Sequence, residues 1–327
     1  MPRHTHLDPR AIVLLLICCV MWGLNQVAVK AAMSEMGPLW QAGLRSLVAA
    51  GLVALWAKWR GIALFQRDGT LRSGLLAGAL FGLEFACIFI GLQYTSASRM
   101  VVFIYLSPFV VALGMPFISA SERLAPRQIA GLVLAFAAVA WAFSEGFHSH
   151  EEASRPLQWL GDSLGVLAAL LWGGTTLAIR GSRLSSASAE KTLLYQLGIS
   201  GLGLSLAALW VGEPLPAEWS LRLSGLFFFQ AVIVSFASYL LWFWMIRHYP
   251  ATRLASFTLA TPLFGLLAGA ALLDEAISPR LGLALLALAV GVALVNRKPE
   301  PAPNEEQTGG SSGVAPTGAA TGKPGDR

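Results

Sequence analysis

The chain has 327 residues, of which 55% are hydrophobic and only 13% are charged, and its mean hydropathy is +0.63. Soluble domains carry about 25% charged residues, so this composition excludes an ordinary soluble protein and indicates a membrane protein. The net charge of +5 does not indicate nucleic acid as a partner, because the basic residues lie between apolar blocks, where they set orientation in a lipid bilayer.

Apolar blocks of about 17 to 24 residues recur along the chain, and each is long enough to cross a hydrocarbon core of about 30 Å as a helix. A β-barrel is excluded because stretches such as LGLALLALAVGVALV are apolar on every face, whereas barrel strands alternate. The sequence therefore predicts an all-α membrane protein with ten transmembrane helices. The predicted spans are 11–33, 38–57, 72–94, 97–119, 126–144, 158–179, 192–212, 222–246, 251–273 and 279–296.

The distribution of basic residues predicts how these spans are oriented. If the N-terminal segment 1–10 is cytoplasmic, most of the 23 Lys and Arg residues fall in cytoplasmic loops and tails. The outer loops then carry only Arg99, Arg155, Arg222 and Arg280. Because cytoplasmic loops are enriched in Lys and Arg, both termini are expected in the cytoplasm. Segment 298–327 is rich in Pro, Gly, Ser and Thr without periodicity, which predicts a disordered cytoplasmic tail.

The chain also repeats itself. MWGLNQVAVK at 21–30 recurs as LWGGTTLAIR at 171–180, and Pro108 recurs as Pro262. This recurrence favours a true first span over a cleaved signal peptide. Each half contains five spans, so the second half must enter the membrane from the opposite side. The sequence predicts two inverted five-helix repeats, which suit alternating access. Their expected bounds are 11–146 and 158–297, separated by an outer loop at 147–157.

Four motifs, in this order and spacing, carry a resemblance to a known family. They are WGLNQVAVK, YTSASRMVVFIYLSPF, SERLAPRQIAGLVLAFAAVA and RHYPATRLASFTLATPLFGLLAGAALLDEAISPRLGLALL. The chain resembles the drug/metabolite transporter superfamily, and within it the EamA-like exporters, over roughly 11–297. The resemblance implies a ten-helix inner-membrane carrier of small metabolites, amino acids or drugs, often an exporter. One departure is that Arg45 has Tyr195, not a cation, at the corresponding position of the second half.

Three ionisable residues, Glu84, Arg45 and Lys30, are singled out inside predicted spans, where a charge costs about 2.5–3.5 kcal/mol or more. Glu84 lies roughly 18 Å from the inner face and Arg45 roughly 10 Å from the outer face, so both are at similar depth. We expect them to share one cavity and to pair directly or through water. Glu84 is interpreted as a proton-coupling group or a counter-ion for a cationic substrate group, with a structural pair to Arg45 as the alternative.

Arg45 is the candidate clamp for a substrate carboxylate, with Gln41 one helical turn away on the same face. Lys30 is a weaker candidate because its side chain can reach the outer surface. Trp22, Asn25 and Gln26 are expected to line the path, with interhelical hydrogen bonding as the alternative for the amides. Further candidates for the cavity are Tyr105, Trp172, Thr175, Tyr195, Tyr239 and Thr258.

Proline and glycine positions predict how the helices bend and pack. Pro108 and Pro262 are expected to kink the fourth and ninth spans. Gly74, Gly78 and Gly82 recur every four residues and predict close helix contact. The fifth and tenth spans are almost wholly apolar, so they are expected at the periphery, as scaffold or as a homodimer surface.

A membrane enzyme acting on a lipid-like substrate is an alternative function, but the sequence offers little for it. His148, His150 and Glu151 have a spacing typical of a solvated loop, and no metal site is predicted. No nucleophile elbow, phosphate loop or HExxH motif is present, so neither a cofactor nor ATP is expected. A passive facilitator is the other alternative. The sequence favours a secondary transporter, a non-enzyme, that moves a small metabolite; protons are one candidate for its coupling ion, which the sequence leaves open.

Overall fold

The structure is a computed structural model that describes residues 9–118, part of 126–141, 157–248, 258 and 260–296. The residues it describes form helices and no strand. Seven helices are long and apolar enough to cross a membrane, and two shorter apolar helices follow. About half of the predicted span 126–144 and most of 251–259 lie outside the described residues.

The first four spanning helices come before residue 119. They are α1 (Pro9–Ala32), α2 (Pro38–Trp59), α3 (Leu71–Gly91) and the pair α4 (Ala97–Ile104) and α5 (Ser107–Ile118). The later ones are α7 (Gln158–Arg180), α8 (Ala189–Val211) and a composite of α9 (Leu221–Phe228), the π-helix η3 (Phe229–Ser238) and α10 (Tyr239–His248). The short 3₁₀-helix η2 (Arg183–Ser186) precedes α8, and α12 (Ala260–Leu273) and α13 (Pro279–Asn296) complete the described fold.

Local sequence signals explain where these helices begin and end. Ser96, Ser188 and Ser220 each accept a backbone N–H from the residue three positions later, as N-cap serines do. Pro38 opens α2 at a position where its missing N–H costs nothing. Gly212 ends α8 with a φ of 70°, a left-handed conformation that glycine adopts without a Cβ penalty.

Pro108 coincides with a break in the fourth span. That span is divided at Tyr105 and Leu106, between the end of α4 and the start of α5, and Pro108 stands in the first turn of α5. A proline there removes a backbone donor that the first turn does not use. Pro262 lies within α12, and Thr258 before it is also helical.

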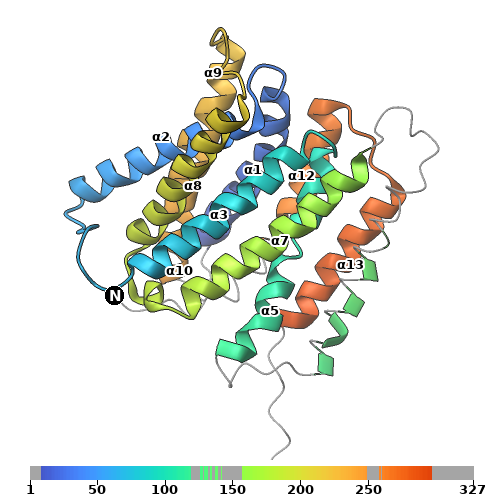
Figure 1. Ribbon diagram of the computed structural model, residues 1–327. Coiled ribbons are helices and arrows are strands. Elements are labelled where there is room, and N and C mark those ends of the chain that lie inside the picture. Colours follow the sequence, from blue (N-terminus) through green and yellow to red (C-terminus); the bar gives the residue numbers. More distant parts are fainter. Residues whose placement is uncertain are drawn as a thin grey trace, which may run out of the picture. The chain divides into compact units, whose positions relative to one another are not determined.

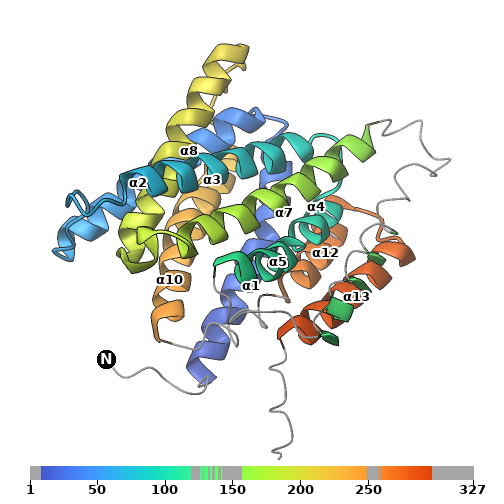
Figure 2. The same ribbon diagram turned by 60° about the horizontal axis from the view of Figure 1, so that its bottom comes forward.

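Helices of the first half of the chain pack against helices of the second half. From the first half, α3 contacts α7 and α8, and α2 contacts α8 and η3. From the second half, α7 also contacts α4 and α5, and α12 contacts α1. Figures 1 and 2 both show α3 lying along α7. Each half thus packs helices against helices of the other half.

The glycines of the repeated Trp-Gly dipeptide, Gly23 and Gly173, lie in such helix contacts. A Cβ at Gly23 of α1 would lie 2.7 Å from the backbone N of Gly265 and 3.0 Å from the Cβ of Phe264 on α12. A Cβ at Gly173 of α7 would lie 2.5 Å from the Cβ of Val110 on α5. Val110 and Phe264 each come two residues after the repeated proline. The dipeptide therefore recurs because each copy supplies a glycine against which the other half packs.

The predicted glycine face of the third span is confirmed. A Cβ at Gly74 would lie 2.6 Å from the ring of Tyr195, and one at Gly78 would lie 2.6 Å from the carbonyl oxygen of the same residue. Gly82 faces Ser200, at 3.3 Å from its Cα. This close approach fixes α3 against α8 and carries Glu84 of α3 toward the interior.

Candidate functional site

Arg45 is the centre of the candidate site. Its side chain is fully buried on α2, and its guanidinium carbon lies 4.2 Å from the ring centroid of Phe85 and 4.9 Å from that of Phe89. Cations over aromatic faces gain about 0.5–2 kcal/mol. Tyr239 and Glu84 are near enough to Arg45 to interact with it electrostatically. Glu84 is also buried, on α3, and its sharing of one cavity with Arg45 stays a prediction.

The two charges do not satisfy each other by hydrogen bonds. All three guanidinium nitrogens of Arg45 and Oε2 of Glu84 are buried without a hydrogen-bond partner among the described residues. A buried charge that lacks hydrogen bonds carries a large desolvation cost. No hydrogen bond joins Arg45 to Glu84 among the described residues, so Oε2 of Glu84 remains available to a solute or to water.

Buried side-chain amides on three elements also have unused hydrogen-bonding capacity. Asn25 and Gln26 on α1 and Gln41 on α2 each have a side-chain oxygen without a partner in the described part of the chain. Gln230 in η3 is fully buried, and neither its oxygen nor its nitrogen is hydrogen-bonded within that part. The sequence analysis did not single out Gln230, although a lone amide inside the apolar run FFFQAVIV was the available signal.

The predicted aromatic side chains come from four parts of the fold. The indole Nε1 of Trp22 donates a hydrogen bond to Ser238 Oγ at 2.9 Å, which joins α1 to η3. Tyr105, at the break between α4 and α5, meets Trp172 of α7 edge to face, with ring centroids 5.8 Å apart. Tyr239, at the start of α10, packs on the core cluster that also includes Trp172. Tyr105, Trp172 and Tyr239 are thus linked by packing, and Trp22 lies in a separate cluster with Trp242.

Three predicted residues are placed differently. Tyr195 packs on Gly74 near the start of α8, and its hydroxyl lies 3.4 Å from Thr70 Oγ1. The hydroxyl of Thr175 is used by its own helix, since it donates to the carbonyl of Leu171 at 2.9 Å. Thr258 is half-buried, and the residues on both sides of it are outside the described part of the chain. These residues are not assigned to the Arg45 region by any contact described here.

Glu213 closes one end of the bundle, which we call the Glu213 end. Its Oε1 accepts the backbone N–H of Trp40 at 2.8 Å, and its Oε2 accepts that of Leu39 at 3.2 Å. The indole of Trp40 in turn donates to the carbonyl of Glu213 at 2.6 Å. A carboxylate at a helix N-terminus satisfies free N–H groups and interacts favourably with the helix dipole. Glu213 thus ties the segment after α8 to the start of α2.

Glu275 also joins the halves at the Glu213 end. Glu275 accepts the backbone N–H groups of Ala97 at 2.8 Å and Ser98 at 3.0 Å, at the start of α4. Lys30, the last charged residue of α1, lies 3.9 Å from Glu275 and donates to the carbonyl of Thr95. Lys30 therefore joins α1 to Thr95 and Glu275. From the sequence alone, its side chain was expected to reach the outer surface.

Asp162 of α7 forms the most buried of these contacts. Arg99 donates to both of its oxygens, with the shortest distance, Nη2 to Oδ2, at 2.6 Å. Thr95 Oγ1 donates to Asp162 Oδ1, also at 2.6 Å. At the edge of the same end, Glu35 accepts from Ser220 Oγ and forms a 3.2 Å ion pair with Arg222. Every one of these contacts joins the first half of the chain to the second.

The opposite end carries one ion pair among the described residues, and we call it the Asp68 end. Lys191, at the start of α8, donates to Asp68 Oδ2 at 2.7 Å and to the carbonyl of Gln66 at 2.9 Å. Thr70 donates to Asp68 Oδ1 through its hydroxyl and its backbone N–H. These hydrogen bonds, that from Lys191 first, lower the pKa of the Asp68 carboxyl.

The structure also bears on metals. Within the described ranges, no group of three or more His, Cys, Asp or Glu side chains is arranged to hold a metal ion. His148, His150 and Glu151, which the sequence analysis set aside as a loop, lie outside those ranges. Cys18, Cys19 and Cys87 are not joined in disulfides.

Comparison with known proteins gives a consistent result. The model of the EamA-like transporter family matches residues 9–144 and again 159–297. An uncharacterized transporter of Bacillus subtilis, YvbV, is 28% identical over 295 residues, which cover 88% of this chain and 92% of that protein. An S-adenosylmethionine/S-adenosylhomocysteine transporter of Chlamydia muridarum is 28% identical over 315 residues, covering 89% and 93%.

Two further similarities extend this result. A probable amino-acid metabolite efflux pump of Escherichia coli is 26% identical over 275 residues, covering 80% of this chain and 87% of the pump. A crystal structure shares the fold with a TM-score of 0.60 at 18% identity, covering 88% of this chain and 96% of the matched one. The relatives are named as transporters, which points to a non-enzyme.

Proposed function

Because the chain belongs to the EamA-like transporter family, we propose that it exports a small zwitterionic metabolite across the inner membrane. In this proposal Arg45 binds the carboxylate of the substrate and Glu84 binds its ammonium group. The chain is a multi-pass membrane protein with seven apolar helices long enough to span a bilayer. Membership supports a transporter of small metabolites, and the residues of the site support the substrate class.

One observation carries this proposal: the opposite charges of Arg45 and Glu84 are buried, and no hydrogen bond joins them to each other among the described residues. The planar guanidinium of Arg45 matches a carboxylate through two parallel hydrogen bonds. Glu84 offers its free Oε2 to an ammonium group. An α-amino acid carries both groups on adjacent atoms, so it satisfies both side chains at once. The relatives named above include an amino-acid metabolite pump and an S-adenosylmethionine transporter, and S-adenosylmethionine carries the same α-ammonium and α-carboxylate.

The remaining residues have supporting roles in the proposal. Asn25, Gln26 and Gln41 line the path with amides, and Tyr105, Trp172 and Tyr239 form its aromatic wall. Proton binding at Glu84 couples transport to a pH gradient, because protonation removes the charge that holds the substrate ammonium.

Alternating access follows from the arrangement of the halves. The repeats 11–146 and 158–297, inverted in the membrane with both termini cytoplasmic, rock against each other around the buried charges. Closure at the Glu213 end and at the Asp68 end then alternates. The packing of helices of one half against helices of the other supports this mechanism, since a two-fold related pair of halves has two equivalent arrangements of the same contacts.

The test uses purified full-length protein in proteoliposomes with a panel of labelled solutes: neutral, acidic and basic amino acids, S-adenosylmethionine and choline. We expect saturable uptake of zwitterionic solutes, stimulated by an imposed pH gradient. Arg45→Gln should lower uptake by about tenfold or more, the effect of removing one charged hydrogen-bonding partner. Glu84→Gln should retain exchange and lose the response to the gradient.

Glu218→Gln is the matched control, because Glu218 is exposed and the change removes the same charge. Transport of choline alone, which has no carboxylate, would contradict the role of Arg45. If transport by the Glu84→Gln variant still responds to the imposed pH gradient, proton coupling does not depend on Glu84. Normal flux after replacing both Asn25 and Gln26 by Leu would contradict the lining role of the amides.

A further inference from the structure

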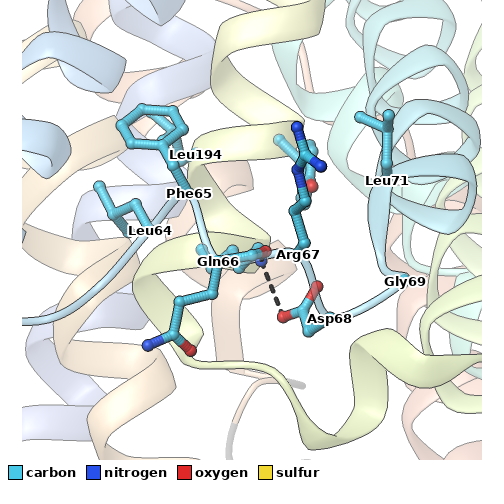
Figure 3. A pocket seen from close by; sticks show the side chains of 10 residues that line it. Leu64, Phe65, Gln66, Arg67, Asp68, Gly69, Leu71 and Leu194 are labelled. Atoms are coloured by element: carbon cyan, nitrogen blue, oxygen red, sulfur yellow. Dashed lines mark hydrogen bonds and ion pairs between the residues drawn. The ribbon is translucent and has the colours of Figure 1, made fainter.

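A cavity lies at the Asp68 end, outside the Arg45 region. It has a volume of about 240 Å³ and is formed by the segment between α2 and α3 together with the start of α8. In the view of Figure 3, the side chain of Arg67 stands between those of Phe65 and Leu71. The dashed line in that figure is the ion pair of Lys191 with Asp68. The cavity therefore combines apolar walls with charged side chains at the edge of the spanning region.

An apolar groove of about 680 Å³ adjoins this cavity. It runs along the last turns of α2, where Ala54, Leu55 and Lys58 line it. The two hollows share three lining residues, Leu64–Gln66, so they form one continuous surface. Leu55 is 64% exposed on this surface and Phe65 is 87% exposed. Apolar side chains this exposed beside a spanning helix are suited to contact with acyl chains.

The basic residues of this surface differ in whether an acidic residue pairs with them. Lys191 is already neutralised by Asp68, the acidic residue that lines the cavity. Lys58 in the groove and Arg67 in the cavity form no ion pair or side-chain hydrogen bond with any described residue. Arg60 follows directly after α2, with its guanidinium 5.8 Å from the ring of Trp56. The surface thus offers cationic groups at the boundary between an apolar groove and water.

We propose that this surface binds one anionic phospholipid from the leaflet at the Asp68 end. The phosphate lies at Lys58 and Arg67. One acyl chain lies along Leu55 of α2 and Ile62 of the segment that follows α2. Charge complementarity selects the headgroup, because clustered basic residues beside a spanning helix attract anionic lipids by about 1 kcal/mol each. The groove selects a lipid over a free phosphate, because only a lipid carries the apolar chain that covers it.

Native mass spectrometry of the purified full-length chain in detergent tests the proposal. The probes are phosphatidylglycerol, phosphatidylcholine with the same acyl chains, and inorganic phosphate. We expect one saturable phosphatidylglycerol site that phosphatidylcholine and inorganic phosphate do not occupy at the same concentration. The double variant Lys58→Gln/Arg67→Gln should bind phosphatidylglycerol about 30-fold more weakly.

The matched control is the double variant Arg72→Gln/Arg180→Gln. It removes the same charge from exposed residues that do not line either hollow, so its phosphatidylglycerol affinity should stay within about twofold of the parent chain. Leu55→Asn, which keeps both cations, should also weaken binding. Equal loss in both double variants, equal binding of the two lipids, or displacement by inorganic phosphate would overturn the proposal. The readout is binding, so it stands apart from the transport assay.

Discussion

The two ends of the bundle are held closed by different kinds of contact. At the Glu213 end, four carboxylates join the halves: Glu35, Asp162, Glu213 and Glu275. Two of them bind helix N-termini, and Asp162 is fully buried with Arg99. At the Asp68 end, the described residues contribute one ion pair, and its Asp68 side chain is 39% exposed.

This difference has an energetic meaning. Buried carboxylates that satisfy backbone N–H groups or a buried arginine are expensive to remove, while the pair of Asp68 with the buried Lys191 is partly screened by solvent on its carboxylate side. We therefore interpret the structure as a state closed firmly at the Glu213 end. Under the proposed mechanism, opening that end requires the simultaneous loss of several charged hydrogen bonds, whereas the described contacts of the Asp68 end open at lower cost.

The largest expected effect is at Asp162. Asp162→Ala leaves Arg99 buried without this carboxylate, which should destabilise the fold by about 3–5 kcal/mol. Thermal unfolding of the detergent-solubilised protein measures the loss. Asp68→Ala, the same change at the other end, should unfold at nearly the wild-type temperature. Equal losses in the two variants would remove the distinction between the ends.

A smaller effect is expected at Glu213. Glu213→Ala leaves the first N–H groups of α2 without their acceptor, which should cost about 1–2 kcal/mol. The same change should open the Glu213 end. A Gln41→Cys reporter in a chain with Cys18, Cys19 and Cys87 replaced by Ser should then react faster with a membrane-impermeant maleimide. Glu213→Gln, which keeps an acceptor oxygen, is the control, and unchanged labelling in Glu213→Ala would show that this contact does not close the end.

The smallest effect is expected at Asp68, and its pH dependence has a definite sign. The pKa of the Asp68 carboxyl is lowered in the folded protein. Its stabilising contribution is therefore present above the unfolded pKa of about 3.9 and is lost as the pH falls toward the folded value. The difference in melting temperature between wild type and Asp68→Asn should stay constant from about pH 8 to pH 5 and shrink only below about pH 4. A melting-temperature difference that changes between pH 5 and pH 7 would contradict a lowered pKa of the Asp68 carboxyl.

Much of the site was predictable because burial of charge in a membrane is a strong signal. Arg45 and Glu84 stand out in apolar spans, and counting residues from each end placed them at similar depth. The count did not show that they remain without hydrogen bonds, because that depends on side-chain geometry between α2 and α3. Gln230 was not singled out because a single amide in an apolar run is ambiguous until its helix neighbours are known. Tyr195 was assigned by its repeat position, whereas packing on Gly74 places it beside Thr70.

The sequence by itself determined the class of this protein: a helical membrane protein built from two similar halves, with its family and its central charges. These follow from hydropathy, helix length and repetition, which are properties of the chain read in order. Only the tertiary structure decided which carboxylate binds which helix end. Glu213, Glu275 and Asp162 find their partners far away in the sequence, at Trp40, Ala97 and Arg99. Such pairings arise when helices of opposite halves pack together, because a buried carboxylate must then find whatever donors the other half presents.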